Sequence, residues 1–245
     1  MTAPRRMKIT VVVPILNEEK VLGRHTREIY DRLETDLRHF DWLLILVDNG
    51  SDDGTPAIAE RLLSRMPRLR YERLEERGKG RAVRHGWEKY QADVNVFMDA
   101  DLATDLEALV PLVEKILGGH DVAIGSRAHP DSIVRRSPLR KAVSLGFRTF
   151  LKTRFSTRIK DAPCGFKAVT GRVVSEVLPK VRNHHWFFDT ELLLRSEHQG
   201  LSIVEVPVFW AERNPEGRRS RVGIAHVSMQ YVREVERLRR DLKEG

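Results

Sequence analysis

Two carboxylates, Asp99 and Asp101, stand one residue apart at the end of an apolar run, residues 96–98. Side chains alternate along a strand, so both carboxylates of such a pair can face one site just beyond the strand end. Carboxylate oxygens suit Mg²⁺ or Mn²⁺, which complete their coordination with water and substrate phosphates. Loop aspartates commonly do no more than form turns. A second acidic cluster, residues 48–55 after the apolar run 43–47, strengthens the prediction of a metal and phosphate site.

Other polar residues stand next to similar apolar runs. Asn17 and Glu18 follow residues 9–14, and we expect Asn17 to cap the helix that begins there. Lys79 stands between two glycines before a helical pattern, where the lysine and the backbone N–H groups can approach a phosphate. A plain turn explains Gly-Lys-Gly equally well, and the P-loop pattern is not present. Arg127 ends a Gly-Ser-Arg segment, which places a guanidinium near the same edge.

The apolar runs alternate with helical patterns along the chain. The runs are short and rich in β-branched residues, at 9–14, 43–47, 94–98, 122–125, 166–169 and 203–208. Helical patterns separate the first four, at 18–33, 56–66, 81–90 and 106–117. This alternation predicts an α/β fold with a mostly parallel, Rossmann-like sheet that carries helices on both faces. Ligands of such sheets bind beyond the carboxyl ends of the strands, which is where the acidic clusters stand.

The composition is that of a globular protein in a reducing compartment. The chain has 245 residues, 41% hydrophobic and 32% charged, which is enough for one substantial domain. Cys164 is the single cysteine, which excludes an internal disulfide. We find no secretory signal and no apolar run near the roughly 20 residues that cross a bilayer. We therefore expect a cytoplasmic protein that does not span a membrane.

The positive charge is concentrated in one segment. The net charge is +8, and residues 133–160 hold nine Lys or Arg without any Asp or Glu. Such a block predicts an anionic partner, whether nucleic acid, anionic lipid or a phosphorylated substrate. On charge alone, a solvated helix face explains the block about equally well. Ser137 and Pro138 are a good helix start, and Leu and Phe recur among the arginines that follow. This interleaving favours a helix that lies on an anionic membrane surface.

The last residues carry a second amphipathic pattern. Apolar residues follow steps of three and four, at Ile224, Val227, Tyr231, Val235, Leu238 and Leu242. This stripe predicts a C-terminal amphipathic helix within residues 222–245. We expect the stripe to pack on the domain or on a second copy of the chain, as a homodimer, rather than on the membrane.

Several motifs, taken in order, resemble those of one enzyme family. Residues 48–55, Gly-Lys-Gly, Asp-Ala-Asp and Gly-Ser-Arg occur in the order seen in inverting family 2 glycosyltransferases with the GT-A fold. The segments 161–167, 186–193 and 205–210 narrow the resemblance to the polyprenyl-phosphate branch. This branch includes the dolichyl-phosphate β-glucosyltransferases and, more distantly, the dolichyl-phosphate mannose synthases. The resemblance covers roughly residues 8–222.

The resemblance implies roles for individual positions in a single domain, residues 1–245. Residues 7–127 would bind the nucleotide sugar, residues 128–221 the acceptor, and residues 222–245 would form the C-terminal helix. The nucleotide-sugar positions are Pro14, Asn17, Glu18, Asp48, Lys79, Asp99 and Asp101, of which the last two would also hold Mg²⁺ or Mn²⁺. The acceptor-phosphate positions are Arg127, Arg140, Arg213 and Ser220. The catalytic positions are Asp101, Arg127 and Asp189.

The implied reaction is inverting transfer of a hexose to a polyprenyl or dolichyl phosphate. UDP-glucose is the favoured donor and GDP-mannose the second, and the enzyme would be attached peripherally to the cytoplasmic face of a membrane. A phosphate monoester has its second pKa at about 6, so it is already ionised at neutral pH and needs no general base. Arginine suits such an acceptor, because its planar fork pairs bidentately with phosphate.

Two alternatives stay open. A family 2 enzyme can instead glycosylate a soluble hydroxyl acceptor, with Asp189 as the general base. The basic segment can also bind nucleic acid in principle. The sequence has no helix-turn-helix, zinc or RNP signature, so we expect no nucleic-acid partner.

Overall fold

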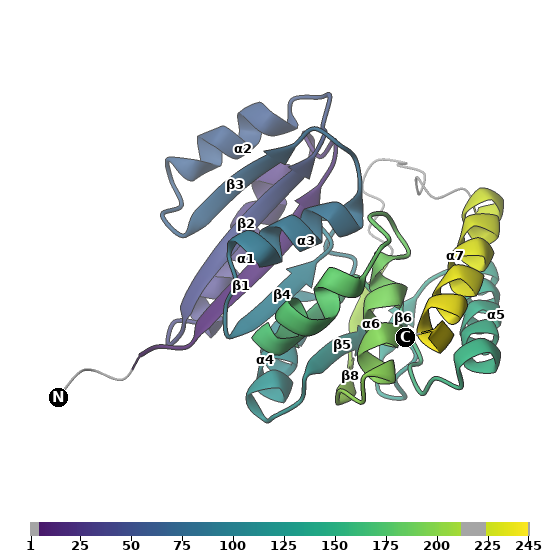
Figure 1. Ribbon diagram of the computed structural model, residues 1–245. Helices are drawn as coiled ribbons and strands as arrows, with labels where there is room; N and C mark the ends of the chain where they lie inside the picture. Colours follow the sequence, from purple (N-terminus) through teal and green to yellow (C-terminus); the bar gives the residue numbers. More distant parts are fainter. Residues whose placement is uncertain (1–4, 212–223, 245) are drawn as a thin grey trace.

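The computed structural model describes residues 5–211 and 224–244. Within these residues, seven strands form one sheet in the order β3-β2-β1-β4-β7-β5-β8, and a small sheet pairs β6 with β9 (Figure 1). Neighbours in the large sheet are parallel except at β7, which runs antiparallel to β4 and β5. The strands of the large sheet are Lys8–Ile15 (β1), Asp41–Asn49 (β2), Leu69–Leu74 (β3), Val94–Met98 (β4), Val122–Ser126 (β5), Phe166–Thr170 (β7) and Ile203–Pro207 (β8).

The apolar runs of the sequence all become strands of the large sheet, so the prediction of a mostly parallel sheet is confirmed. The sequence did not predict β3, because Arg70 and Glu72 interrupt its apolar residues, as an edge strand allows. The last run was predicted as one strand to residue 208, but β8 ends at Pro207. Phe209–Ala211 then forms β9 beside β6 (Ile133–Arg135).

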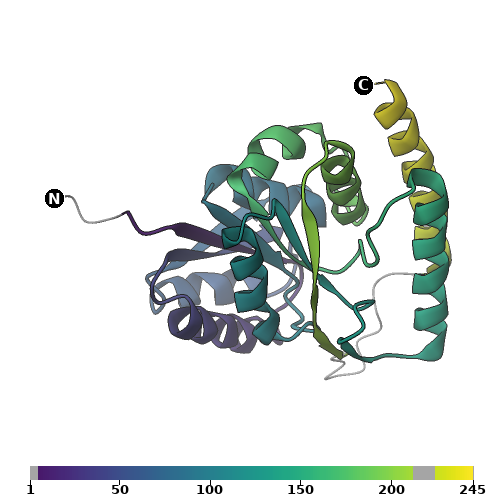
Figure 2. The same cartoon turned by 90° about the horizontal axis from the view of Figure 1, so that it is seen from below.

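Helices cover both faces of the large sheet, as predicted. One face carries α1 (Leu22–Asp36), α2 (Thr55–Leu63) and α4 (Leu109–Leu117). The other face carries α3 (Lys79–Lys89) and α6 (Phe188–His198) (Figures 1 and 2). Short helical turns at Leu106–Ala108 (η1), Val173–Val177 (η2) and Leu178–Lys180 (η3) lie in the connections.

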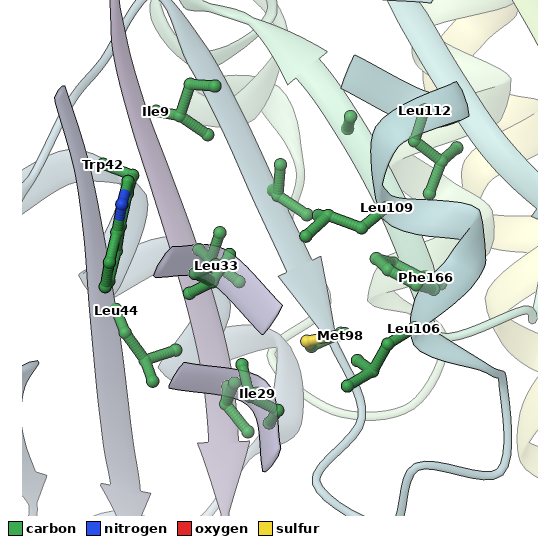
Figure 3. Packing of buried hydrophobic residues seen from close by; sticks show 14 of the residues in the cluster. Ile9, Ile29, Leu33, Trp42, Leu44, Met98, Leu106, Leu109, Leu112 and Phe166 are labelled. Carbon is green, nitrogen blue, oxygen red and sulfur yellow. The ribbon is translucent and has the colours of Figure 1, made fainter. Parts of the chain in front are cut away.

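The core consists of two apolar layers, one on each face of the sheet. Along β1, Val11 and Val13 lie in the layer beneath α1, α2 and α4, whereas Val12 lies in the layer beneath α3 and α6. Figure 3 shows the first layer, where Leu33 of α1 and Leu109 of α4 pack over the strands. All residues of β1 after Lys8 are buried, as expected for a central strand covered on both faces. This burial fixes the positions of the strand ends that carry the polar residues.

Two further helices, α5 (Pro138–Phe155) and α7 (Ile224–Glu244), lie side by side at one flank of the sheet (Figures 1 and 2). Pro138 stands in the first turn of α5, as predicted, although the Ser137 side chain makes no capping hydrogen bond. On α7, Val235 and Leu238 are fully buried, so over the described residues the C-terminal apolar stripe packs on its own domain. No helix in the described ranges is both long and apolar enough to cross a bilayer.

Candidate functional site

The polar residues singled out in the sequence gather at the carboxyl edge of the large sheet. The parallel strands β1, β2, β4 and β5 all end at this edge, and candidate residues follow each of them. Because β7 runs the other way, its start lies beside the end of β4, and the Asp99 N–H donates to the Gly165 carbonyl at 3.0 Å. The fold therefore brings the acidic pair together with the segment that precedes β7.

Asn17 joins the loops that follow β1 and β2. Its backbone is left-handed, with φ 53°, and its side chain donates to Asp52 Oδ1 at 2.6 Å and accepts the Asp52 N–H at 2.9 Å. The prediction that Asn17 caps a helix is wrong, because α1 begins only at Leu22 and Val21 stands at its N-cap position. The side chain instead ties the two loops together.

Asp48 lies one residue before the end of β2. It is fully buried, and its two carboxylate oxygens accept the Ser51 N–H and the Tyr71 hydroxyl, each at 2.9 Å. Burial and the neighbouring Asp48 raise the pKa of Tyr71, so the phenol stays protonated as the donor. The structure thus gives Asp48 a part in shaping the loop that follows β2, and its contact with the nucleotide sugar stays a prediction.

Pro14 and Glu18 lie near the end of β1 and in the loop that follows it. Pro14 lies one residue before the end of β1 and is buried, and the Glu18 N–H donates to Thr55 Oγ1 at 2.7 Å. The Thr55 contact holds the start of α2 against the loop after β1. Both residues therefore lie at the same sheet edge as Asp99, and their contact with the nucleotide sugar stays a prediction.

Lys79 lies at the centre of a row of alternating charges. From the start of α3, its Nζ lies 2.7 Å from Asp99 Oδ1 and 3.2 Å from Asp189 Oδ2. Lys167 of β7 donates to the other Asp189 oxygen at 2.8 Å and to the Cys164 carbonyl. The side chains of Lys167 and Asp189 are 0% and 2% exposed. Two lysines and two carboxylates thus compensate one another at the sheet edge.

Burial disfavours every charge in this row, and the neighbours decide which way each pKa moves. Burial opposes ionisation of Asp189, but Lys167 and Lys79 outweigh it and hold the pKa of Asp189 below its ordinary value. Burial opposes the charge of Lys79 too, but Asp189 and Asp99 outweigh it and raise the pKa of Lys79. Asp99 differs, because burial, with Asp101 and Asp189 nearby, raises its pKa in spite of Lys79.

The two carboxylates after β4 have different surroundings. Asp99 is held against Gly165, where a Cβ atom would overlap with the Asp99 carboxylate, yet the Asp99 side chain remains 40% exposed. Asp101 is exposed, and one of its oxygens accepts the Ala103 N–H at 3.0 Å. Leu102 is left-handed, with φ 52°, which leucine rarely adopts. Backbone strain of this kind is common at functional sites.

These two carboxylates fit a divalent cation that a substrate helps to bind. In the part of the chain that the structure describes, no group of three or more His, Cys, Asp or Glu side chains forms a metal site. A cation at Asp101, with Asp99 beside it, would take its other ligands from water and a diphosphate, which is how Mg²⁺ is commonly bound.

Arg127 follows the end of β5 and is bound to Asp161. Its Nε and one terminal nitrogen donate to the two Asp161 oxygens at 2.8 and 2.7 Å, and its guanidinium lies 5.7 Å from the ring centre of Trp210. Burial would lower the pKa of Arg127, but Asp161 outweighs it and the pKa is raised. Arginine has five N–H donors, so this pairing orients the fork and leaves donors that an anion can use.

A cationic groove lies between α5 and residues 159–163. Its volume is about 170 Å³, and the cationic residues that line it are Arg127, Arg136, Lys141, Arg148 and Lys160. The buried Arg136 Nε has no hydrogen-bond partner among the described residues. Burial, and then the nearby Arg127 and Arg140, lower the pKa of Arg136, so three guanidinium groups share this corner. Such a concentration of cations suits an anionic ligand.

The structure thus places most of the predicted residues at one edge, in two groups. Arg213 and Ser220 lie outside the described residues. Sequence reasoning missed the roles of Lys167 and Trp186, whose ring centre lies 5.5 Å from Lys79 Nζ. A lysine within an apolar strand is a signal that points to Lys167, because a buried charge needs a partner. No comparable local signal points to Trp186.

Comparison with known proteins identifies relatives. Residues 10–178 match the family described as glycosyl transferase family 2. Glycosyltransferase AglD of Haloferax volcanii is 34% identical over 206 residues, which are 83% of this chain and 33% of that protein. Dolichyl-phosphate beta-glucosyltransferase of Mus musculus is 33% identical over 223 residues, which are 84% of this chain and 68% of that protein. The chain therefore spans a third of the length of the first relative.

The fold also has a counterpart among solved structures. Glucosyl-3-phosphoglycerate synthase from Mycobacterium tuberculosis, in complex with Mn²⁺ and UDP-glucose, is similar with a TM-score of 0.65 and 21% identity. The likeness covers 92% of this chain and 77% of that one. At this level of identity the likeness concerns the fold alone.

Proposed function

The chain belongs to glycosyl transferase family 2, and from this premise we propose that it transfers a hexose from a nucleotide sugar to a polyprenyl phosphate at a membrane surface. UDP-glucose is the favoured donor, because one relative is a dolichyl-phosphate beta-glucosyltransferase, and GDP-mannose is the second. In-line attack by the phosphate would invert the anomeric centre, so an α-linked donor would give a β-linked lipid phosphate.

One observation carries the proposal: the segment 161–165 connects the acidic pair with the cationic groove. Gly165 lies against the Asp99 carboxylate, and Asp161, four positions earlier, binds Arg127 and lines the groove with it. A donor diphosphate at Asp99 and Asp101 would thus lie next to a cationic site for a second, anionic substrate. An uncharged hydroxyl acceptor has no need of such a groove.

On the donor side, the residues of this chain would bind and orient the diphosphate. Lys79 supplies a cation whose position is fixed by Asp189, and Asp99 and Asp101 present carboxylates at the exposed edge. Mg²⁺ or Mn²⁺, held by Asp101 with Asp99 beside it, would neutralise the charge that develops on the leaving diphosphate. Pro14, Asn17, Glu18 and Asp48 would surround the nucleoside.

On the acceptor side, the reaction needs a bound phosphate rather than a base. Arg127, Arg136 and Lys160 line the groove, and the Arg127 fork is oriented by Asp161. Asp189, the base that a hydroxyl acceptor would require, is buried between two lysines that lower its pKa. This setting favours the phosphate acceptor over the soluble hydroxyl acceptor. Arg140, Arg213 and Ser220 stay candidates for the same phosphate.

The basic helix α5 is the proposed contact with the membrane. Leu139, Val143 and Leu145 are exposed on α5, and Ile133 is exposed on β6 just before it. Cations near an anionic leaflet contribute about 1 kcal/mol each, so several suffice for reversible attachment at the cytoplasmic face. The apolar stripe of α7 packs on the domain, so the proposal needs no homodimer.

The donor half of the proposal is tested by a screen of nucleotide sugars with and without Mn²⁺. UDP-glucose or GDP-mannose should raise the Tm of the protein, and Asp101→Asn should remove the metal-dependent part of this rise while leaving the unliganded Tm unchanged. Asp105→Asn is the control, because the Asp105 side chain accepts only the Glu107 N–H of its own loop among the described contacts. Equal stabilisation of Asp101→Asn and wild type would refute the assigned metal site.

A further inference from the structure

Residues 182–187, which precede α6, cover one side of Lys79. Trp186 is 48% exposed, and its ring centre lies 5.5 Å from Lys79 Nζ. The His184 carbonyl lies against Gly78, where a Cβ atom would overlap with it. The Gly-Lys-Gly turn is therefore packed against this segment, and the position of Trp186 bears directly on the position of Lys79.

Tyr231 of α7 holds Trp186 from the other side. Its hydroxyl donates to the Trp186 carbonyl at 3.0 Å. Its ring makes edge contacts with Phe147 of α5 and with Phe187, at centroid separations of 5.3 and 5.4 Å. Burial, with Asp189 nearby, raises the pKa of Tyr231, so the phenol remains a donor at neutral pH. One side chain of α7 thus contacts both α5 and the segment over Lys79.

A second contact from α7 fixes the start of the same segment. Glu191 of α6 is fully buried, and its carboxylate accepts the backbone N–H groups of Arg182 and Asn183 at 3.1 and 2.9 Å. Arg237 of α7 donates to this carboxylate at 2.8 Å. The segment is therefore held from α7 at both ends, at Trp186 through a direct hydrogen bond and at Arg182 through Glu191.

We propose that Tyr231 is a positioning residue for the donor site, which holds Trp186 over Lys79 and so keeps the lysine between Asp99 and Asp189. The inference rests on the proposed function in one respect, namely that the nucleotide sugar binds beside Asp99. Among the described contacts, Tyr231 makes none with Asp99 or Asp101, and its hydrogen bond goes to Trp186. Its contact with Phe147 makes it the link between the donor site and α5.

The kinetic test is Tyr231→Phe, which removes the hydroxyl and keeps the ring contacts. We expect the KM for the nucleotide sugar to rise about three- to tenfold, the effect of one lost hydrogen bond, while the KM for the lipid phosphate stays unchanged. Tyr90→Phe is the matched control, because it removes a hydroxyl that donates to Glu72 at the opposite end of α3. A wild-type KM for the nucleotide sugar in Tyr231→Phe, or a change confined to the lipid phosphate, would overturn the proposal.

A spectroscopic test needs neither acceptor nor turnover. Acrylamide quenching of tryptophan fluorescence, measured with and without Trp186→Phe, isolates the Trp186 signal from the other tryptophans. We expect Tyr231→Phe to increase the quenching of Trp186 in the ligand-free protein, and Tyr90→Phe to leave it unchanged. Equal quenching in Tyr231→Phe and wild type would overturn the positioning role even where transfer to a lipid phosphate is observed. Increased quenching without any transfer would support the positioning role and refute the proposed acceptor.

Discussion

Asp189 lies between two lysines at the sheet edge, and this setting decides what it can do chemically. Its side chain is almost fully buried, and Lys79 and Lys167 hold its pKa below the ordinary value. A general base needs a pKa near the working pH and access to the substrate. Asp189 is therefore better suited to anchor Lys79 beside Asp99 than to deprotonate a hydroxyl acceptor.

The ion pairs of Asp189 lead to a prediction about stability and pH. Because the folded-state pKa is lowered, their contribution is present above the unfolded-state pKa of about 3.9 and is lost as the pH falls through the folded-state value. At neutral pH, Asp189→Asn should lower the free energy of unfolding in urea by about 3–5 kcal/mol, because the buried Lys167 loses its anionic partner and Lys79 keeps only Asp99. The difference from wild type should narrow below about pH 4. A difference that stays constant in acid would show that Asp189 is not ionised in the folded protein.

Gly165 sets the position of the Asp99 carboxylate, which a single methyl group can change. A Cβ atom at Gly165 would overlap with this carboxylate, so Gly165→Ala forces Asp99 away from Lys79. Misplacement by about 1 Å can cost about 10²-fold in rate, so we expect kcat to fall by about that factor with little change in Tm. Gly146→Ala on α5 is the control, because its Cβ meets open space. Retention of wild-type kcat by Gly165→Ala would contradict the assigned role of Asp99.

An ion pair with a buried carboxylate holds helix α7 against helix α6. Arg237 donates to Glu191, which is fully buried and also pairs with Arg195. Arg237→Leu should lower the free energy of unfolding by about 3 kcal/mol, the lower end of the range for a broken buried pair, because Arg195 remains. Arg233→Leu, an exposed arginine on the same helix, should stay within about 0.5 kcal/mol of wild type. Equal effects of the two substitutions in urea unfolding would refute the role of Glu191.

The helix α5 presents apolar residues to solvent, which a membrane would cover. Leu139 and Val143 stand one turn apart and are 65% and 41% exposed. Burial of a leucine-sized side chain contributes about 1.5–3 kcal/mol, so Leu139→Ser with Val143→Ser should weaken binding to anionic vesicles by about tenfold or more. Leu117→Ser, an exposed leucine on α4, should bind as wild type does. Cosedimentation that responds to neither the α5 substitutions nor salt would rule out this surface.

For the whole molecule, the sequence predicts the order of the elements better than their long-range pairing. The apolar runs predict the parallel strands, and a buried strand that ends in carboxylates places Asp99 and Asp101 at the correct edge. The edge strand β3 escapes prediction, because it mixes charged with apolar residues. The sequence also does not predict that β7 runs antiparallel to β4, because a short apolar run does not indicate the direction of a strand relative to its neighbours.

The long-range contacts of the candidate site are likewise not predicted from the sequence. Local patterns identify Lys79 and Arg127 as polar residues at strand ends, but their anionic partners Asp189 and Asp161 are 110 and 34 positions away. Ion pairs over such separations leave no periodic signal in a single sequence. The sequence predicts the cationic groove only as a charged segment. Which of its arginines line the groove depends on how α5 lies against residues 159–163, and a single sequence does not show this packing.

The central claim is that the hexose is transferred to a phosphate and not to a hydroxyl, and a comparison of two acceptors tests it most directly. The protein is incubated with labelled UDP-glucose or GDP-mannose, Mn²⁺, and vesicles that contain either a polyprenyl phosphate or the polyprenol of the same length. We predict labelled lipid only with the phosphate, at a rate nearly constant above about pH 7, because the second pKa of the acceptor is about 6. Transfer to the polyprenol or to a soluble hydroxyl acceptor, with the lipid phosphate left unmodified, would contradict the account.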